Sequence, residues 1–196
     1  MRRFLKTLLL LAAPVSVLGD EPQATEALSF TVELAKTVFA ADQIFQVVAT
    51  VRNVSDHPVI IHLNPVSFAA FHVELVGEDG ISVPRHVDRT GMYAASGPHD
   101  FTQLDPGEAA RLAVDAKLLD RPVDVCGIGG DLCETLEGPI VGYGAVYLPV
   151  KHQGQYVLKA VYSLSEQRAL DYESRFGFRD VWFGRIKSNG VAITIE

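Results

Sequence analysis

The chain lacks the short motifs that mark common catalytic sites. It holds no Gly-x-Ser-x-Gly nucleophile turn, no His-Glu-x-x-His zinc motif and no phosphate-binding P-loop. Its six histidines are scattered. Alternation along extended strands places His57 and His62 on opposite faces, and it turns His62 and His72 toward solvent. The sequence therefore predicts no catalytic residue, no metal ligand and no cofactor.

Basic residues are in the minority. The 196 residues include 17 Lys and Arg against 24 Asp and Glu, which gives a formal net charge of −7. Such a surface repels the phosphates of nucleic acids and of anionic lipids. Nucleic acid is therefore not a predicted partner, and the scattered acids are interpreted as solubilising surface charge.

Long apolar runs are missing except near the N-terminus. There, three cations precede an apolar run from Leu8 to Leu18, which is about half the length that a membrane-spanning helix needs. This pattern predicts a signal peptide over residues 1–19, cleaved after Gly19, and a flexible N-terminus over residues 20–27. We expect no membrane span, and a protein exported to the periplasm or the extracellular space.

Cysteine is scarce. The chain contains Cys126 and Cys133, with several glycines in the short stretch between them. Because exported proteins meet oxidising compartments, we expect a disulfide that closes this loop. The spacing matches neither the dithiol of redox enzymes nor half of a zinc ribbon. Such a bond would fix one loop without holding the whole fold together.

Alternation of apolar and polar residues with a period of two dominates the rest of the chain, and it is clearest from Ala109 to Leu118. Breaks rich in Gly, Pro and Asp recur between the alternating stretches. Residues 28–196 are thus predicted to form a single all-β domain with little room for helix. The predicted inward-facing residues are Leu28, Phe30, Val32, Leu34, Phe45, Val47, Ala49, Val51, Val59, Ile61, Leu63, Phe71, Val73, Leu75, Ala110, Leu112, Val114, Ala116, Leu118, Tyr156, Leu158, Ala160, Tyr162, Val191, Ile193 and Ile195.

Two local patterns carry further expectations. The tripeptide Gly154-Gln155-Tyr156 opens a strand, and in immunoglobulin-like sandwiches a tyrosine at that place often caps the corner. The tripeptide Asn53-Val54-Ser55 matches the glycosylation sequon.

Four stretches together resemble a known class of domain. They are 45–54, 58–63, 101–108 with its Leu-Asp-Pro-Gly-Glu turn, and 154–156. Their order is similar to immunoglobulin-like domains of bacterial exported proteins, and to the BsuPI-type proteinase inhibitor domain. The resemblance implies an antiparallel immunoglobulin-like (fibronectin III-like) β-sandwich of about seven to nine strands with long loop insertions. It assigns no residue an inhibitory role.

Three predicted loops are longer than usual: 85–103, 119–152 and 165–180. Binding residues on such folds lie mostly in loops. An immunoglobulin-like order would bring the first and third loops together at one end of the sandwich. The predicted binding surface there consists of His86, Tyr93, His99, Phe101, Arg175, Phe176 and Trp182.

An alternative for the same aromatic residues is that they fold the loops back onto the body. For Trp182 in particular, a buried position at the start of a strand is the expected role. We thus predict a non-catalytic interaction module with a protein ligand, a proteinase being one candidate, in preference to a carbohydrate ligand. The alternative is an envelope enzyme or a metal-binding protein built on the same sandwich.

Overall fold

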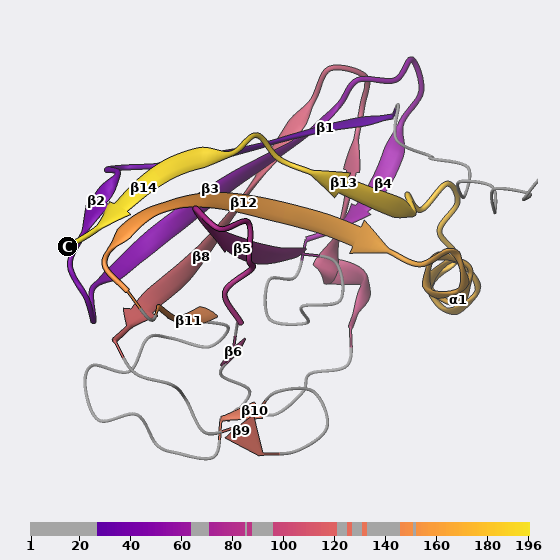
Figure 1. The fold of residues 1–196 in the computed structure, drawn as a ribbon. Helices are drawn as coiled ribbons and strands as arrows, with labels where there is room; N and C mark the ends of the chain where they lie inside the picture. The colour runs from indigo at the N-terminus through magenta and orange to yellow at the C-terminus, as the bar shows by residue number, and fades with distance from the viewer. Residues whose placement is uncertain are drawn as a thin grey trace, which may run out of the picture.

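The computed structural model describes residues 27–63, 71–84, 86–87, 96–120, 125–126, 131–132, 146–150 and 152–196. Most of them lie in strands (Figure 1). In chain order the elements are β1 (Leu28–Leu34), β2 (Val38–Phe39), β3 (Ile44–Asn53), β4 (Val59–His62), β5 (Phe71–Gly77), β6 (His86–Val87), η1 (Pro98–Asp100), β7 (Phe101–Leu104), β8 (Ala109–Leu119), β9 (Val125–Cys126), β10 (Asp131–Leu132), β11 (Val146–Pro149), β12 (Gly154–Leu164), α1 (Glu166–Phe176), β13 (Gly184–Lys187) and β14 (Val191–Ile195).

The first sheet has the order β1-β3-β8-β11-β6-β10-β9. β3 pairs antiparallel with β1 along one edge and with β8 along the other. Its alternate residues Phe45, Val47, Ala49 and Val51 are buried, as the alternation predicts. β11 joins β8 in parallel. The end of β8 departs from the pattern, because Lys117 is buried where the strand is flanked by both β3 and β11.

The second sheet is built around β12. β5 pairs along one edge of β12, while β13 and β14 follow each other along the opposite edge. β2 extends this sheet by pairing in parallel with β14. The break between β13 and β14 is bridged by Ser188, whose Oγ accepts a hydrogen bond from Ala160 N (2.9 Å). The ladder thus continues across the break without an unpaired amide at Ala160.

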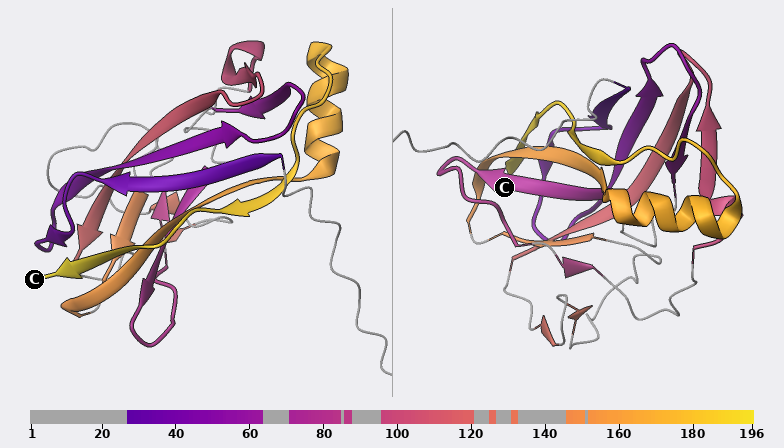
Figure 2. Two further views of the ribbon diagram at one scale, coloured as in Figure 1. Left: turned by 90° about the horizontal axis from the view of Figure 1, so that it is seen from above. Right: turned by 90° about the vertical axis from the view of Figure 1, so that its right-hand side faces the viewer.

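The two sheets face each other over one apolar core, and α1 lies across one end of them (Figure 2). The order β1-β3-β8 in one sheet and β5-β12-β14 in the other is that of an immunoglobulin-like sandwich. The predicted tyrosine corner is present, since Tyr156 Oη donates to the carbonyl oxygen of His152 (2.7 Å). The predicted fold class is therefore confirmed. Most of the predicted inward-facing residues are buried. Five of them are only half-buried at the margin of the core, namely Leu34, Leu63, Ala110, Tyr156 and Val191.

Three details differ from the prediction. Fourteen strands are present among the described residues, several of only two residues, against about seven to nine expected. The pairs β11–β8, β6–β10 and β14–β2 are parallel, so the sandwich is not purely antiparallel. A helix, α1, occupies most of the loop predicted over 165–180.

Several predictions fall on residues outside the described ranges. They are the signal peptide over 1–19, most of the flexible N-terminus over 20–27, and Cys133. The disulfide therefore stays a prediction, with Cys126 at the end of β9.

Asn53 closes the end of β3 with a fully used amide group. Its side chain is buried (0% exposed), and Nδ2 donates to the carbonyl oxygens of His57 (2.8 Å) and Leu104 (2.9 Å). Its Oδ1 accepts from the backbone N and Oγ of Ser55. The amide thereby joins β3, the turn before β4 and the end of β7. Although Asn53 matches a sequon, its nitrogen is occupied and enclosed in the folded protein.

Replacement of Asn53 by Asp is expected to lower the free energy of unfolding by about 2–4 kcal/mol. The carboxylate cannot donate to the two carbonyl oxygens, so buried acceptors lose their partners and a charge is enclosed with them. Urea denaturation measures the change. The matched control is Gln155→Glu at an exposed position of β12, with an expected change within about 0.5 kcal/mol. Equal stability of the two variants would contradict the role of the Asn53 amide.

Candidate functional site

Helix α1 fills the connection between β12 and β13. It begins after Ser165, whose Oγ accepts from Arg168 N (3.4 Å). It ends at Gly177, which adopts the left-handed conformation (φ 73°) and donates its N–H to Glu173 O (2.9 Å). Glu173 also accepts, through Oε1, from the backbone N of Val181 (2.9 Å). The helix is therefore held at both ends and tied to the chain that leads into β13.

Beneath α1 lies an aromatic cluster, which consists of His62, Phe101, Tyr172, Phe176 and Phe178. The His62 ring is stacked on Tyr172 (5.6 Å between centroids, 6° between planes) and meets Phe101 edge-on (4.8 Å). Phe101 also lies 5.7 Å from Phe176 and 4.9 Å from Phe178. β4, β7 and α1 meet in this cluster. It fixes the helix against the sandwich.

His62 corrects a sequence prediction. The alternation along the strand predicts that the His62 side chain faces solvent. The side chain is instead 1% exposed, because α1 covers that face of the strand. Its Nε2 lies 3.2 Å from Ser96 Oγ. Burial lowers the pKa of His62, and Arg168 lowers it further, while Asp100 acts in the opposite direction. The imidazole is therefore neutral at pH 7 and serves as a packing group.

The backbone of His62 is anchored by Tyr162 of β12. The Tyr162 hydroxyl accepts from His62 N (2.9 Å) and donates to His62 O (3.1 Å). Burial raises the pKa of Tyr162 far above its ordinary value, so this hydroxyl keeps its proton. The Tyr162 ring packs against Phe30 of β1 and against Trp182. One side chain of the second sheet thus connects β1, β4 and the chain before β13.

The structure brings some of the predicted binding residues together. Phe101 and Phe176 touch within the aromatic cluster, so the loops predicted over 85–103 and 165–180 do meet at one end. The Arg175 guanidinium lies over the Phe176 ring (5.1 Å), and His99 is exposed in η1. Trp182 is 5% exposed, the buried position expected for it.

The remaining two predicted binding residues are His86 and Tyr93. His86 lies in β6, which pairs with β11. Tyr93 lies outside the described residues. The aromatic rings at this end therefore serve first to pack the loops, the alternative that the sequence left open.

Apart from Arg175, sequence reasoning missed the outward face of α1, since it predicted a loop there. We call this face the helix surface. It comprises exposed residues spaced three and four apart, and at its centre Leu170 is 52% exposed. Gln167 Nε2 donates to Asp171 Oδ1 (3.0 Å) along the same face. The helix surface consists of Gln167, Leu170, Asp171, Ser174 and Arg175.

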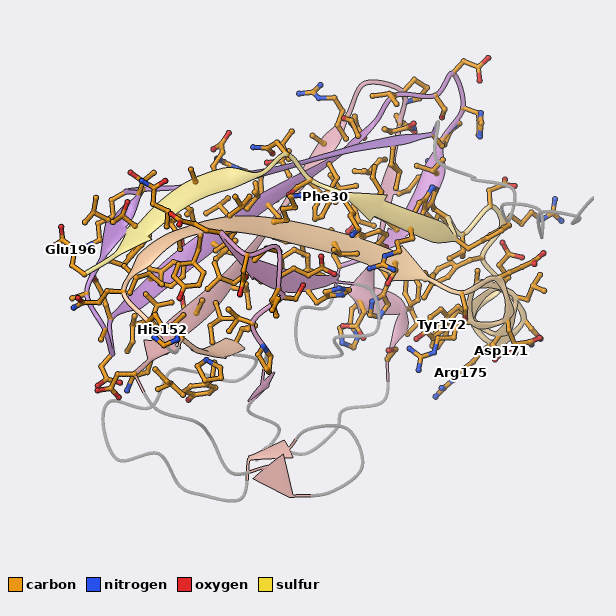
Figure 3. All side chains as sticks on the ribbon, viewed as in Figure 1. Phe30, His152, Asp171, Tyr172, Arg175 and Glu196 are labelled. Carbon is orange, nitrogen blue, oxygen red and sulfur yellow. The ribbon has the colours of Figure 1, made fainter. Side chains whose placement is uncertain are left out.

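A second feature lies away from α1, toward the other end of the molecule. A cleft of about 470 Å³ opens between the turn after β5 and the start of β12, and its lining includes Asp79, Ile81, His152 and Tyr156. Figure 3 shows His152 far from Tyr172 and Arg175, which lie on α1. None of the described residues that line this cleft was predicted to bind a ligand.

Two kinds of feature are absent from the part of the chain that the structure describes. No group of three or more His, Cys, Asp or Glu side chains is arranged to hold a metal ion there. Within the same residues, no helix has the length and apolar character needed to cross a membrane.

Comparison with known proteins does not assign the chain to a family. No protein-family model matches the chain, and no curated protein matches it in sequence. Among solved structures, the chain is similar to the CARDB domain of a Pyrococcus furiosus protein, determined in complex with di-metal ions. The TM-score is 0.35 and the identity 10%, over 94% of this chain and 100% of that one. This likeness is too low to support an argument. The immunoglobulin-like fold rests instead on the strand order of this chain.

The lowered pKa of His62 predicts that folding stability falls in mild acid. Below the ordinary pKa of 6.5 the unfolded chain takes up a proton at His62, whereas the folded protein does so only at lower pH. Stability is thus fully present above pH 6.5 and decreases as the pH falls toward the lowered pKa, by at most about 1.4 kcal/mol per pH unit. Urea denaturation between pH 8 and 5 measures it.

His62→Gln should flatten this pH dependence, because the residue no longer titrates. The exposed His57 supplies the control, and His57→Gln should keep the full acid-side decrease. If the wild-type protein and His62→Gln lose stability in parallel, the burial of His62 does not govern the acid sensitivity.

Proposed function

We propose that the protein is an exported, non-catalytic interaction module that binds a partner protein through the helix surface. The observation that carries this proposal is the separation of α1 from the main core. Leu164, Ala169 and Val181 form a small apolar cluster of their own, apart from the large core between the sheets. The sandwich does not need α1 to bury its core, so this long connection is available for function.

The helix surface has the chemistry of a recognition site. Leu170 offers an apolar contact at the centre, with Asp171 and Arg175 beside it as charges of opposite sign. Protein interfaces commonly combine an apolar anchor with a polar rim, and arginine is enriched among their key residues. Because the aromatic cluster holds α1 in place, a partner would meet a preorganised surface and pay little ordering entropy.

Export, the disulfide between Cys126 and Cys133, and a proteinase as one candidate partner belong to the same proposal. They are supported by the sequence patterns given above. The enzyme alternative would draw on the hydrogen bond between Ser96 and His62. The enclosure of the His62 ring between Phe101 and Tyr172 favours a packing role instead.

Truncation of Leu170 is expected to weaken partner binding about tenfold, since an apolar anchor contributes roughly 1–2 kcal/mol. A partner is first captured from the native envelope fraction with the mature protein and identified by mass spectrometry. Its affinity for purified wild-type protein and for Leu170→Ala is then measured by calorimetry. Arg175→Ala should also weaken binding.

The matched control is Val38→Ala, which truncates another exposed apolar side chain (44% exposed) in β2, far from α1 (Figure 1). It should bind like the wild-type protein. If Leu170→Ala and Val38→Ala bind equally well, the helix surface is not the binding site. Failure to capture any partner would count against the interaction module as a whole.

A further inference from the structure

We propose that the cleft between the β5 turn and the start of β12 binds a basic, extended segment of a protein. In this arrangement a lysine or arginine stem lies along Ile81 and Tyr156, and its cation faces Glu78 and Asp79. This site is separate from the helix surface and does not depend on it.

The first wall of the cleft is a turn that its own hydrogen bonds hold in shape. Gly80 N donates to Gly77 O (3.0 Å), and Gly77 N donates to Ile81 O (3.0 Å). Asp79 Oδ1 accepts from Ile81 N (2.9 Å). Gly80 has a φ of 76°, which side chains disfavour, and a Cβ at Gly77 would come within 2.9 Å of Asp79 Oδ1. The backbone of the turn and the Asp79 side chain are therefore held in a fixed arrangement.

The second wall is equally well held. Tyr156 donates its hydroxyl proton to His152 O, so the loop before β12 is tied to the strand. Tyr156 is paired with Gly77 across the β12–β5 ladder. The register places the Tyr156 ring beside the β5 turn. A Cβ atom at Gly77, if the residue had one, would lie 3.7 Å from Tyr156 Cε1. Because both walls are preorganised, a ligand would lose little affinity to ordering the site.

The charge of the cleft selects for a cation. Of the described residues that line it, Glu78 and Asp79 carry negative charge, and no lysine or arginine is among them. Both acids are exposed at the rim. The formal net charge of the chain is −7, which adds a long-range attraction for basic ligands. Among the described lining residues, a cation at the rim would meet two carboxylates and neither a lysine nor an arginine.

The apolar part of the cleft favours a cation that is carried on an apolar stem. Ile81 is 68% exposed, the highest value among the exposed large apolar side chains of the described residues. It lines the cleft together with the Tyr156 ring and with Pro84 and Pro149. Lysine and arginine bury their methylene stems on such surfaces while the charged end stays polar, and an aromatic face attracts the cation further. A volume of about 470 Å³ accommodates such a side chain with neighbouring backbone.

The test is a titration of the ¹⁵N-labelled mature protein with the acetylated, amidated peptide Gly-Lys-Gly-Arg-Gly, followed by amide chemical shifts. Shifts confined to residues 77–82 and 152–156 are expected. The charge-reversed peptide Gly-Glu-Gly-Glu-Gly should cause none. The double variant Glu78→Gln, Ile81→Ser should bind the basic peptide about tenfold more weakly, because it loses both a charge and an apolar contact.

The matched control is Glu166→Gln, which removes an exposed acid on α1 and should leave peptide affinity unchanged. Shifts spread over the acidic surface, with equal weakening in the control, would show nonspecific attraction and overturn the site. Binding of the acidic peptide, or no shift at all, would overturn it as well. If spermidine binds the cleft as tightly as the peptide, the occupant is a small polyamine and the proposed protein segment is wrong.

Discussion

The hydrogen bonds between the Tyr162 hydroxyl and the backbone of His62 are the contact on which the α1 end of the molecule depends. Tyr162 lies on the central strand of the second sheet, so its position is fixed by ladders on both sides. Its hydroxyl satisfies both backbone groups of a buried residue at the end of β4. The His62 ring then supports Tyr172, and through it the helix. These two hydrogen bonds inside the core therefore help to place α1, together with the contacts at its ends and the aromatic cluster.

Polar side chains close the other edges of the sandwich by the same physical rule. Asn53 saturates its amide at the end of β3, and Asn189 pairs its amide with both backbone groups of Val32 on the edge strand β1. Each of these contacts joins segments distant in the sequence and leaves no orphaned group at that point. The apolar core supplies the bulk of the stability, while these contacts fix how its strands and connections are placed.

The strands were predictable because a half-buried strand must alternate. From Phe45 to Val51 every second residue is apolar and buried, and Val48 is the one apolar residue at an outward position. The tyrosine corner was predictable because its place in the chain is specific. The burial of His62 was not predictable, because alternation describes the two faces of β4 alone. It cannot include α1, which follows much later in the chain and covers the face of β4 on which His62 lies. The signals for that helix were present in Ser165 and Gly177, but its charged, weakly apolar sequence is typical of a loop.

The candidate surfaces were less accessible from sequence than the fold. The meeting of Phe101 with Phe176 followed from loop order, whereas the helix surface required knowing that 166–176 is helical. The cleft could not be predicted from the sequence, because its walls are a hairpin turn and the start of a strand, and neither pattern by itself indicates a binding site. Only the register of β5 against β12 places Gly77 beside Tyr156.

The central claim is that the sandwich, through Tyr162, holds α1 as a rigid surface. Hydrogen exchange of the Tyr162→Phe variant tests it most directly, since the variant keeps the ring and removes the hydroxyl. The account predicts faster exchange of the α1 amides and of β4, with β3 and β8 as protected as in the wild-type protein. Unchanged protection of α1, or an equal loss across all strands, would contradict it.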